Sequence, residues 1–195
     1  MRRRPAPRVA GPLVRALHRT RLCSLVLALV ALPLAATAQT GEALIRKLGA
    51  SQPIANPTFP ADKSLQYKVL WDVTQGPEKP GALVDGFRRP ANFLVMAEQE
   101  GVPRSNVQLA IIVHGTATQS LLRNDAYKAA TGADNQNVAL LQALSDAGVK
   151  IVVCGQALIN RKVPRDGLLP FVTVATSATM ARATLHAQGY ATFTP

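Results

Sequence analysis

The stretch Val149–Gln156, VKIVVCGQ, runs a block of β-branched residues directly into a cysteine and a glycine. A short apolar run of this kind predicts a strand buried in a parallel sheet, because helices cover both faces of such a sheet. We expect the strand over 149–153 and a short helix over 155–162, so that Cys154 stands at the junction. Ligands of open α/β sheets collect at this carboxyl edge of the strands. The stretch therefore indicates an α/β fold with a thiol at its ligand-binding edge.

Strand and helix signals alternate through the rest of the chain. Further strands are expected over residues 65–73, 107–113, 171–174 and 190–193. Apolar residues recur at helical spacing over 83–95, 135–147 and 177–188. Pro90 lies inside the first of these patterns and predicts a break there, or a second helix that begins at it. The alternation predicts an α/β domain built around a mostly parallel five-stranded sheet.

The first 38 residues have the three parts of a secretory signal. An arginine-rich start precedes the apolar run Leu22–Leu34, and the small residues around Ala36 and Ala38 end it. We predict cleavage before Gln39 and export, most simply to a bacterial periplasm, with no stable membrane association of the mature chain. An uncleaved membrane anchor is the alternative, although the apolar run is shorter than the roughly 20 residues that a spanning helix needs.

The leader also accounts for most of the charge. The formal net charge is +11, but residues 1–38 hold seven arginines and no acids, which leaves 15 basic against 11 acidic residues, a net of +4. That balance gives no support for nucleic-acid binding. Residues 39–64, with a helical possibility over 42–48 and three prolines after it, are interpreted as an N-terminal arm or linker. The domain itself is expected over residues 65–195.

Cys154 is the one cysteine left after the leader, because Cys23 lies inside the signal. It cannot close an internal disulfide, so its thiol is free, paired between chains, or chemically used. Its place before a helix favours the nucleophilic thiolate. Gly155 would allow a close backbone approach and Gln156 could donate a hydrogen bond. The alternative is that Cys154 is a small buried residue of the core.

His114 ends another predicted strand, in the segment AIIVHGTAT. If the two strands are neighbours, its imidazole and the Cys154 thiol lie on one rim, where Gly115 and Thr116 could present an amide and a hydroxyl to an anion. A structural histidine is the alternative. Arg161 belongs to a basic cluster after the short helix, for which a solvated surface turn is the favoured interpretation.

Signatures of other chemistries are missing from the sequence. It holds no phosphate-binding loop, no strand-linked GxGxxG, no GxSxG elbow, no HExxH and no paired CxxC. We therefore expect no nucleotide cofactor, no serine hydrolase and no structural zinc. Metal or redox sensing, with Cys154 and His114 gathered across subunits, has only two candidate ligands per chain.

Four segments, IIVHGTAT, DNQN, LSDAGVKIVVCGQAL and LLPFVTVATSATMARATLHAQGY, resemble in order and spacing the DsrE/DsrF-like family, over about residues 65–193. The resemblance implies a three-layer α/β domain, assembled as a homo-trimer or hexamer. It implies that Cys154 corresponds to the cysteine on which sulfur-relay members carry a persulfide, whereas His114 belongs to the pattern of a subgroup. Relay members are cytoplasmic and pass sulfur to dedicated partners, while this chain carries an export signal.

Two functions follow from these observations. The first is an exported sulfur-handling protein that takes up sulfane sulfur on Cys154 from a small sulfur species or a donor protein and passes it on. The second is a non-catalytic oligomeric module in which Cys154 is structural.

Overall fold

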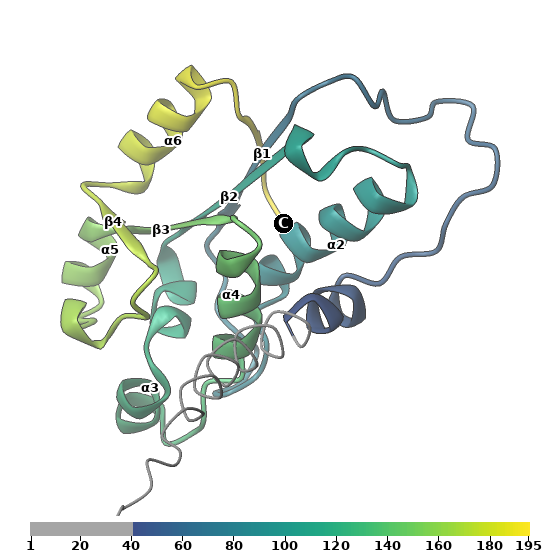
Figure 1. Ribbon diagram of the computed structural model, residues 1–195. Coiled ribbons are helices and arrows are strands. Elements are labelled where there is room, and N and C mark those ends of the chain that lie inside the picture. The colour runs from purple at the N-terminus through teal and green to yellow at the C-terminus, as the bar shows by residue number, and fades with distance from the viewer. Residues whose placement is uncertain (1–40) are drawn as a thin grey trace, which may run out of the picture.

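The computed structural model of the protein describes residues 41–195, and the predicted signal and its cleavage site lie outside them. Five strands form one sheet in the order β4-β3-β2-β1-β5, and every neighbouring pair is parallel (Figure 1). The strands are β1 (Tyr67–Val73), β2 (Val107–Val113), β3 (Lys150–Cys154), β4 (Thr173–Ala175) and β5 (Ala191–Phe193). The predicted α/β fold with a five-stranded parallel sheet is confirmed.

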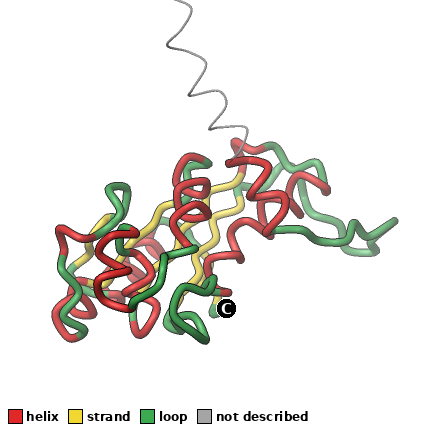
Figure 2. The backbone as a smooth tube through the Cα atoms, turned by 90° about the horizontal axis from the view of Figure 1, so that it is seen from below, coloured by secondary structure: helices red, strands yellow, loops and turns green. Residues whose placement is uncertain are grey.

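Helices cover both faces of the sheet (Figure 2). Helices α2 (Asp85–Gln99) and α4 (Asn137–Asp146) pack on one face and bury the larger core with residues such as Phe87 and Leu140. The short helix α5 (Gly155–Asn160) and α6 (Ala178–Ala187) cover the other face with a smaller apolar cluster, which includes Cys154. Side chains alternate along a strand, so Cys154 points to the α5 and α6 side while its neighbour Val153 enters the larger core.

Residues 114–134, for which the sequence predicts no regular element, fold into a 3-10 segment over Gly115–Leu121 and the helix α3 (Asn124–Thr131). Two further 3-10 turns cover Arg104–Asn106 and Arg165–Gly167. Leu121, Leu122 and Tyr127 of this stretch are buried in the larger core.

The break predicted at Pro90 was wrong, because α2 runs through it without interruption. A proline inside a helix removes one backbone hydrogen bond and costs about 3 kcal/mol. Here the ring of Pro90 is buried on the sheet side of the helix, next to Phe87 and Ala91, which are fully buried. The apolar contact of this face with the sheet outweighs the lost hydrogen bond.

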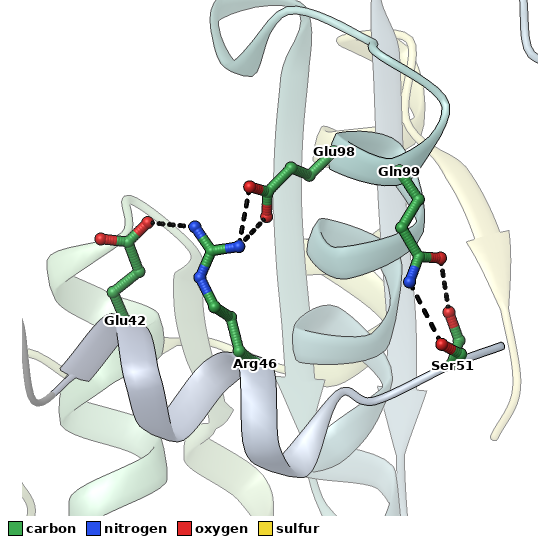
Figure 3. A network of polar contacts seen from close by, with 5 residues as sticks. All are labelled: Glu42, Arg46, Ser51, Glu98 and Gln99. Carbon is green, nitrogen blue, oxygen red and sulfur yellow. Dashed lines mark hydrogen bonds and ion pairs between the residues drawn. The ribbon is translucent and has the colours of Figure 1, made fainter. Parts of the chain in front are cut away.

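The segment interpreted as an arm is fixed to the domain over its first part. Residues 41–48 form a helix whose Ile45 enters the larger core. Arg46 of this helix binds both carboxylate oxygens of Glu98 on α2, at 2.7 and 2.6 Å, and Ser51 bonds Gln99 of the same helix at 2.9 Å (Figure 3). The loop that follows projects away from the helices and leaves Phe59 95% exposed (Figure 1).

Within residues 41–195, no helix combines the length and the apolar character that crossing a membrane requires.

Candidate functional site

Cys154 and His114 lie at the ends of neighbouring strands. Cys154 is the last residue of β3, and His114 follows the last residue of β2 directly. The register pairs Val113 with Val153, which places His114 and Cys154 next to each other in the following row. An open pocket of about 460 Å³ is lined by both residues, together with Gly115, Gln156, Ala157, Asn160 and Arg161. The thiol residue is only 7% exposed and is reached from this pocket.

Asp72, which lies in no recognisable sequence motif, holds His114 in place. It is buried near the end of β1, on the side of the sheet that faces α5 and α6, as its place two residues after Leu70 requires. Its Oδ1 lies 3.1 Å from Nε2 of His114. A buried carboxylate is costly unless it is paired and hydrogen-bonded, so this contact anchors the imidazole at the pocket rim.

The second carboxylate oxygen of Asp72 pairs with an arginine on α6. Oδ2 lies 3.0 Å from Nη1 of Arg182 on α6. The carboxylate therefore joins β1, the residue after β2, and α6 in one charged network beside the pocket. Arg182 does not line the pocket, whereas Arg161 does, and the Arg161 side chain is exposed. The excess charge at the pocket mouth is thus positive and suited to an anionic ligand.

Gly115 and Thr116 shape the turn after β2 in different ways. Gly115 has a φ of +60°, and a Cβ at this position would lie 2.5 Å from the carbonyl oxygen of Thr74. The Thr116 hydroxyl donates to the Thr74 carbonyl at 3.2 Å and accepts from the amide of Gly76 at 2.7 Å. Thr116 is therefore engaged in holding the neighbouring loop and is not among the residues that line the pocket of Cys154.

Gly155 and Gln156 follow the thiol directly. A Cβ at Gly155 would lie 2.7 Å from the carbonyl oxygen of Ala175, so the glycine permits the close approach of β4 to the start of α5. Gln156 is exposed and lines the pocket of Cys154 as well as a second hollow beside β4. Of the two residues, Gln156 is the one whose side chain can meet a ligand.

Among residues 41–195, no group of three or more His, Cys, Asp or Glu side chains is arranged to hold a metal ion. The site therefore consists of the Cys154 thiol, the His114 imidazole and the Asp72 carboxylate, each at or next to the end of a different strand.

Comparison with known proteins identifies relatives of this fold. The model of the DsrE/DsrF-like family matches residues 89–195. A protein of unknown function from Methanobacterium thermoautotrophicum, MTH1491, is similar at 19% identity with a TM-score of 0.49, over 66% of this chain and 99% of that one. The YchN protein of E. coli is similar at 24% identity with a TM-score of 0.45, over 65% of this chain and 99% of its own. No curated protein matches the chain.

Proposed function

Because the chain belongs to the DsrE/DsrF-like family, we propose that it is a sulfur-handling protein that carries sulfane sulfur as a persulfide on Cys154. The family suggests a role related to sulfur relay. The observation that carries the finer proposal is the shared pocket of Cys154 and His114 at the carboxyl ends of two adjacent parallel strands. A thiol beside an imidazole is the arrangement that produces a nucleophilic thiolate at neutral pH.

The proposed uptake step uses an anionic donor such as thiosulfate. The Cys154 thiol gives its proton to His114, and the thiolate attacks the outer sulfur of the donor. A new sulfur–sulfur bond forms on Cys154, the bond to the sulfonate sulfur breaks, and sulfite leaves with the electron pair. Release reverses the roles: an acceptor thiolate attacks the outer sulfur of the persulfide, and Cys154 leaves as the thiolate.

The groups around the thiol support an anionic donor. Arg161 and Asn160 from the end of α5 and Gln156 from its start line the same pocket. In the proposed complex, their donors would bind the sulfonate end of a thiosulfate whose outer sulfur meets Cys154. We assign Gln156 and Arg161 to substrate binding, and we assign no ligand contact to Gly115, Thr116 or Gly155, which set the backbone around the pocket.

Export and assembly are part of the same proposal. The predicted leader over residues 1–38 supports the proposal of a periplasmic protein that receives sulfur from small species or from a donor protein there. Ile159 on α5 is 71% exposed and Met180 on α6 is 61% exposed, and both helices lie on the face of Cys154. These apolar side chains support a homo-oligomer, a trimer or a hexamer.

Mass spectrometry of the purified protein tests the persulfide. The Cys23→Ser variant leaves Cys154 as the one thiol of the chain. After incubation with thiosulfate or polysulfide it is expected to gain the mass of one sulfur atom, removable by dithiothreitol. The matched Cys23→Ser/Cys154→Ser variant should gain nothing. An unchanged mass with several donors at neutral pH would sink the proposal.

The burial of Cys154 favours a second candidate, a non-catalytic oligomeric module. At 7% exposure the side chain packs with Leu70, Ala110 and Ile112 in the smaller apolar cluster. A purely structural thiol reacts slowly with iodoacetamide in the folded protein and rapidly in urea. Comparable rates in both states would exclude this candidate.

A further inference from the structure

We propose that Asp72 is a positioning residue that sets the tautomer and charge of His114, so that Asp72, His114 and Cys154 act as one acid–base chain. This inference rests on the proposed role of Cys154 as a thiolate. It adds a residue that neither the sequence motif nor the family comparison points to, since Asp72 lies before the matched residues 89–195.

The geometry defines which nitrogen of His114 is engaged. Nε2 lies 3.1 Å from Oδ1 of Asp72. An ionised carboxylate only accepts hydrogen bonds, so Nε2 must carry the proton. In the neutral ring Nδ1 then holds the lone pair and is the atom able to take a proton from the pocket. The carboxylate also stabilises the imidazolium that forms when the Cys154 proton arrives.

Because Asp72 is buried, its charge acts strongly on the imidazole ring of His114. Its side chain is 6% exposed, against 27% for His114, so the carboxylate faces the imidazole with little water between them. Charge interactions are stronger at such sites than at the surface. The other charged groups near His114 are Arg182, which binds the second oxygen of Asp72 from α6, and Arg161, which lines the pocket from the end of α5.

A structural role is the competing explanation, because the Asp72–Arg182 ion pair also ties α6 to β1. The two roles differ in what they predict for the thiol. A tie between elements changes the stability of the protein and leaves the pH dependence of Cys154 as it was. A positioning role moves that pH dependence, and it does so only while His114 is present.

Alkylation kinetics separate these roles. In the Cys23→Ser background, the rate of Cys154 with iodoacetamide is followed from pH 5 to 10, with circular dichroism as the check on folding. We expect Asp72→Asn to slow the reaction at pH 7 about tenfold, equal to a shift of the pH profile by one unit toward higher pH. His114→Gln should slow it similarly, and the double variant no further than His114→Gln alone. Asp85→Asn, an exposed ion-pair partner on α2, is the matched control.

Two results would contradict the positioning role of Asp72. An unchanged profile in Asp72→Asn, or a second tenfold loss when it is added to His114→Gln, overturns the positioning role. Iodoacetamide reacts with the thiolate and needs no sulfur donor. The persulfide proposal can therefore fail while the positioning role of Asp72 is confirmed. The positioning role can likewise fail while the persulfide is detected.

A second measurement needs no Asp72 variant and covers the case in which that variant does not fold. Nitrogen-15 NMR of the histidine side chains reports which ring nitrogen is protonated, and His114→Gln assigns the signal. The proposal requires the Nε2–H form of His114 above the pH at which the ring loses its charge. A ring protonated on Nδ1, or an even mixture of the two forms, contradicts it.

Discussion

Replacing Gly115 with alanine tests how the turn after β2 places His114. The glycine has a φ of +60°, where an L side chain costs about 1–2 kcal/mol. The new Cβ would also lie 2.5 Å from the carbonyl oxygen of Thr74, an overlap with backbone that cannot swing aside. Overpacking of this kind costs about 1–3 kcal/mol. We therefore expect Gly115→Ala to lower the free energy of unfolding by about 2–5 kcal/mol, the sum of these two penalties.

Gly132→Ala is the matched control for this prediction. Gly132 has a φ of +78° at the end of α3, and a Cβ there meets nothing within 4 Å. Only the backbone penalty of about 1–2 kcal/mol should remain. Urea unfolding followed by circular dichroism measures both variants. Alkylation of Cys154 should slow in Gly115→Ala and stay unchanged in Gly132→Ala. If the two variants lose equal stability, the contact with Thr74 does not shape the turn.

Two further predictions concern the N-terminal helix and a surface carboxylate. Ile45→Ala should destabilise the whole domain by about 2 kcal/mol in urea unfolding, since the lost side chain is nearly buried, whereas the control Arg46→Ala removes only exposed ion pairs and should change little. No effect of Ile45→Ala would mean that the helix over 41–48 unfolds separately. The hydrogen bond from Asn124, and then the one from Lys128, lowers the pKa of Asp134 in the folded protein. A lowered pKa stabilises the fold above the unfolded value of about 3.9, and this contribution is lost as the pH falls through the folded value. The stability difference between the wild type and Asp134→Asn should therefore shrink from pH 7 to pH 3, and a difference independent of pH would contradict the assignment.

The regular elements of this fold are readable from the sequence because each has a strong local pattern. The apolar strands at 107–113 and 149–153 and the capped helix after Ser177, whose hydroxyl accepts from the amide of Met180, formed close to where they were expected. The helix break predicted at Pro90 was wrong because the effect of a proline depends on what its ring contacts, which is a property of the tertiary structure. The turn and helix over residues 115–131 had no periodic pattern, since their contacts are made one by one with distant loops, as in the bond between Thr116 and Gly76.

Asp72 was missed for a related reason. In the segment LQYKVLWDV a single carboxylate near a strand end fits an exposed side chain at the sheet edge as well as a buried one. What decides between them is Arg182, far along the chain, together with the order of strands that sets β1 beside β2. A lone acid directly after the apolar run Val69–Trp71 is the signal that was available, because burying it requires partners elsewhere in the chain.

The burial of Cys154 affects which sulfur donors and acceptors can reach its thiol in the proposed relay. At 7% exposure inside an open pocket, its sulfur is reached by small anionic donors more readily than by a cysteine on a protein surface. In the proposed persulfide, the added sulfur would lie about 2 Å beyond Sγ. This outer sulfur would then be more accessible than the free thiol, and it is the atom that an acceptor would attack. This arrangement favours uptake from small species and delivery to a larger acceptor, with the emptied thiol withdrawn from unwanted reactions between transfers.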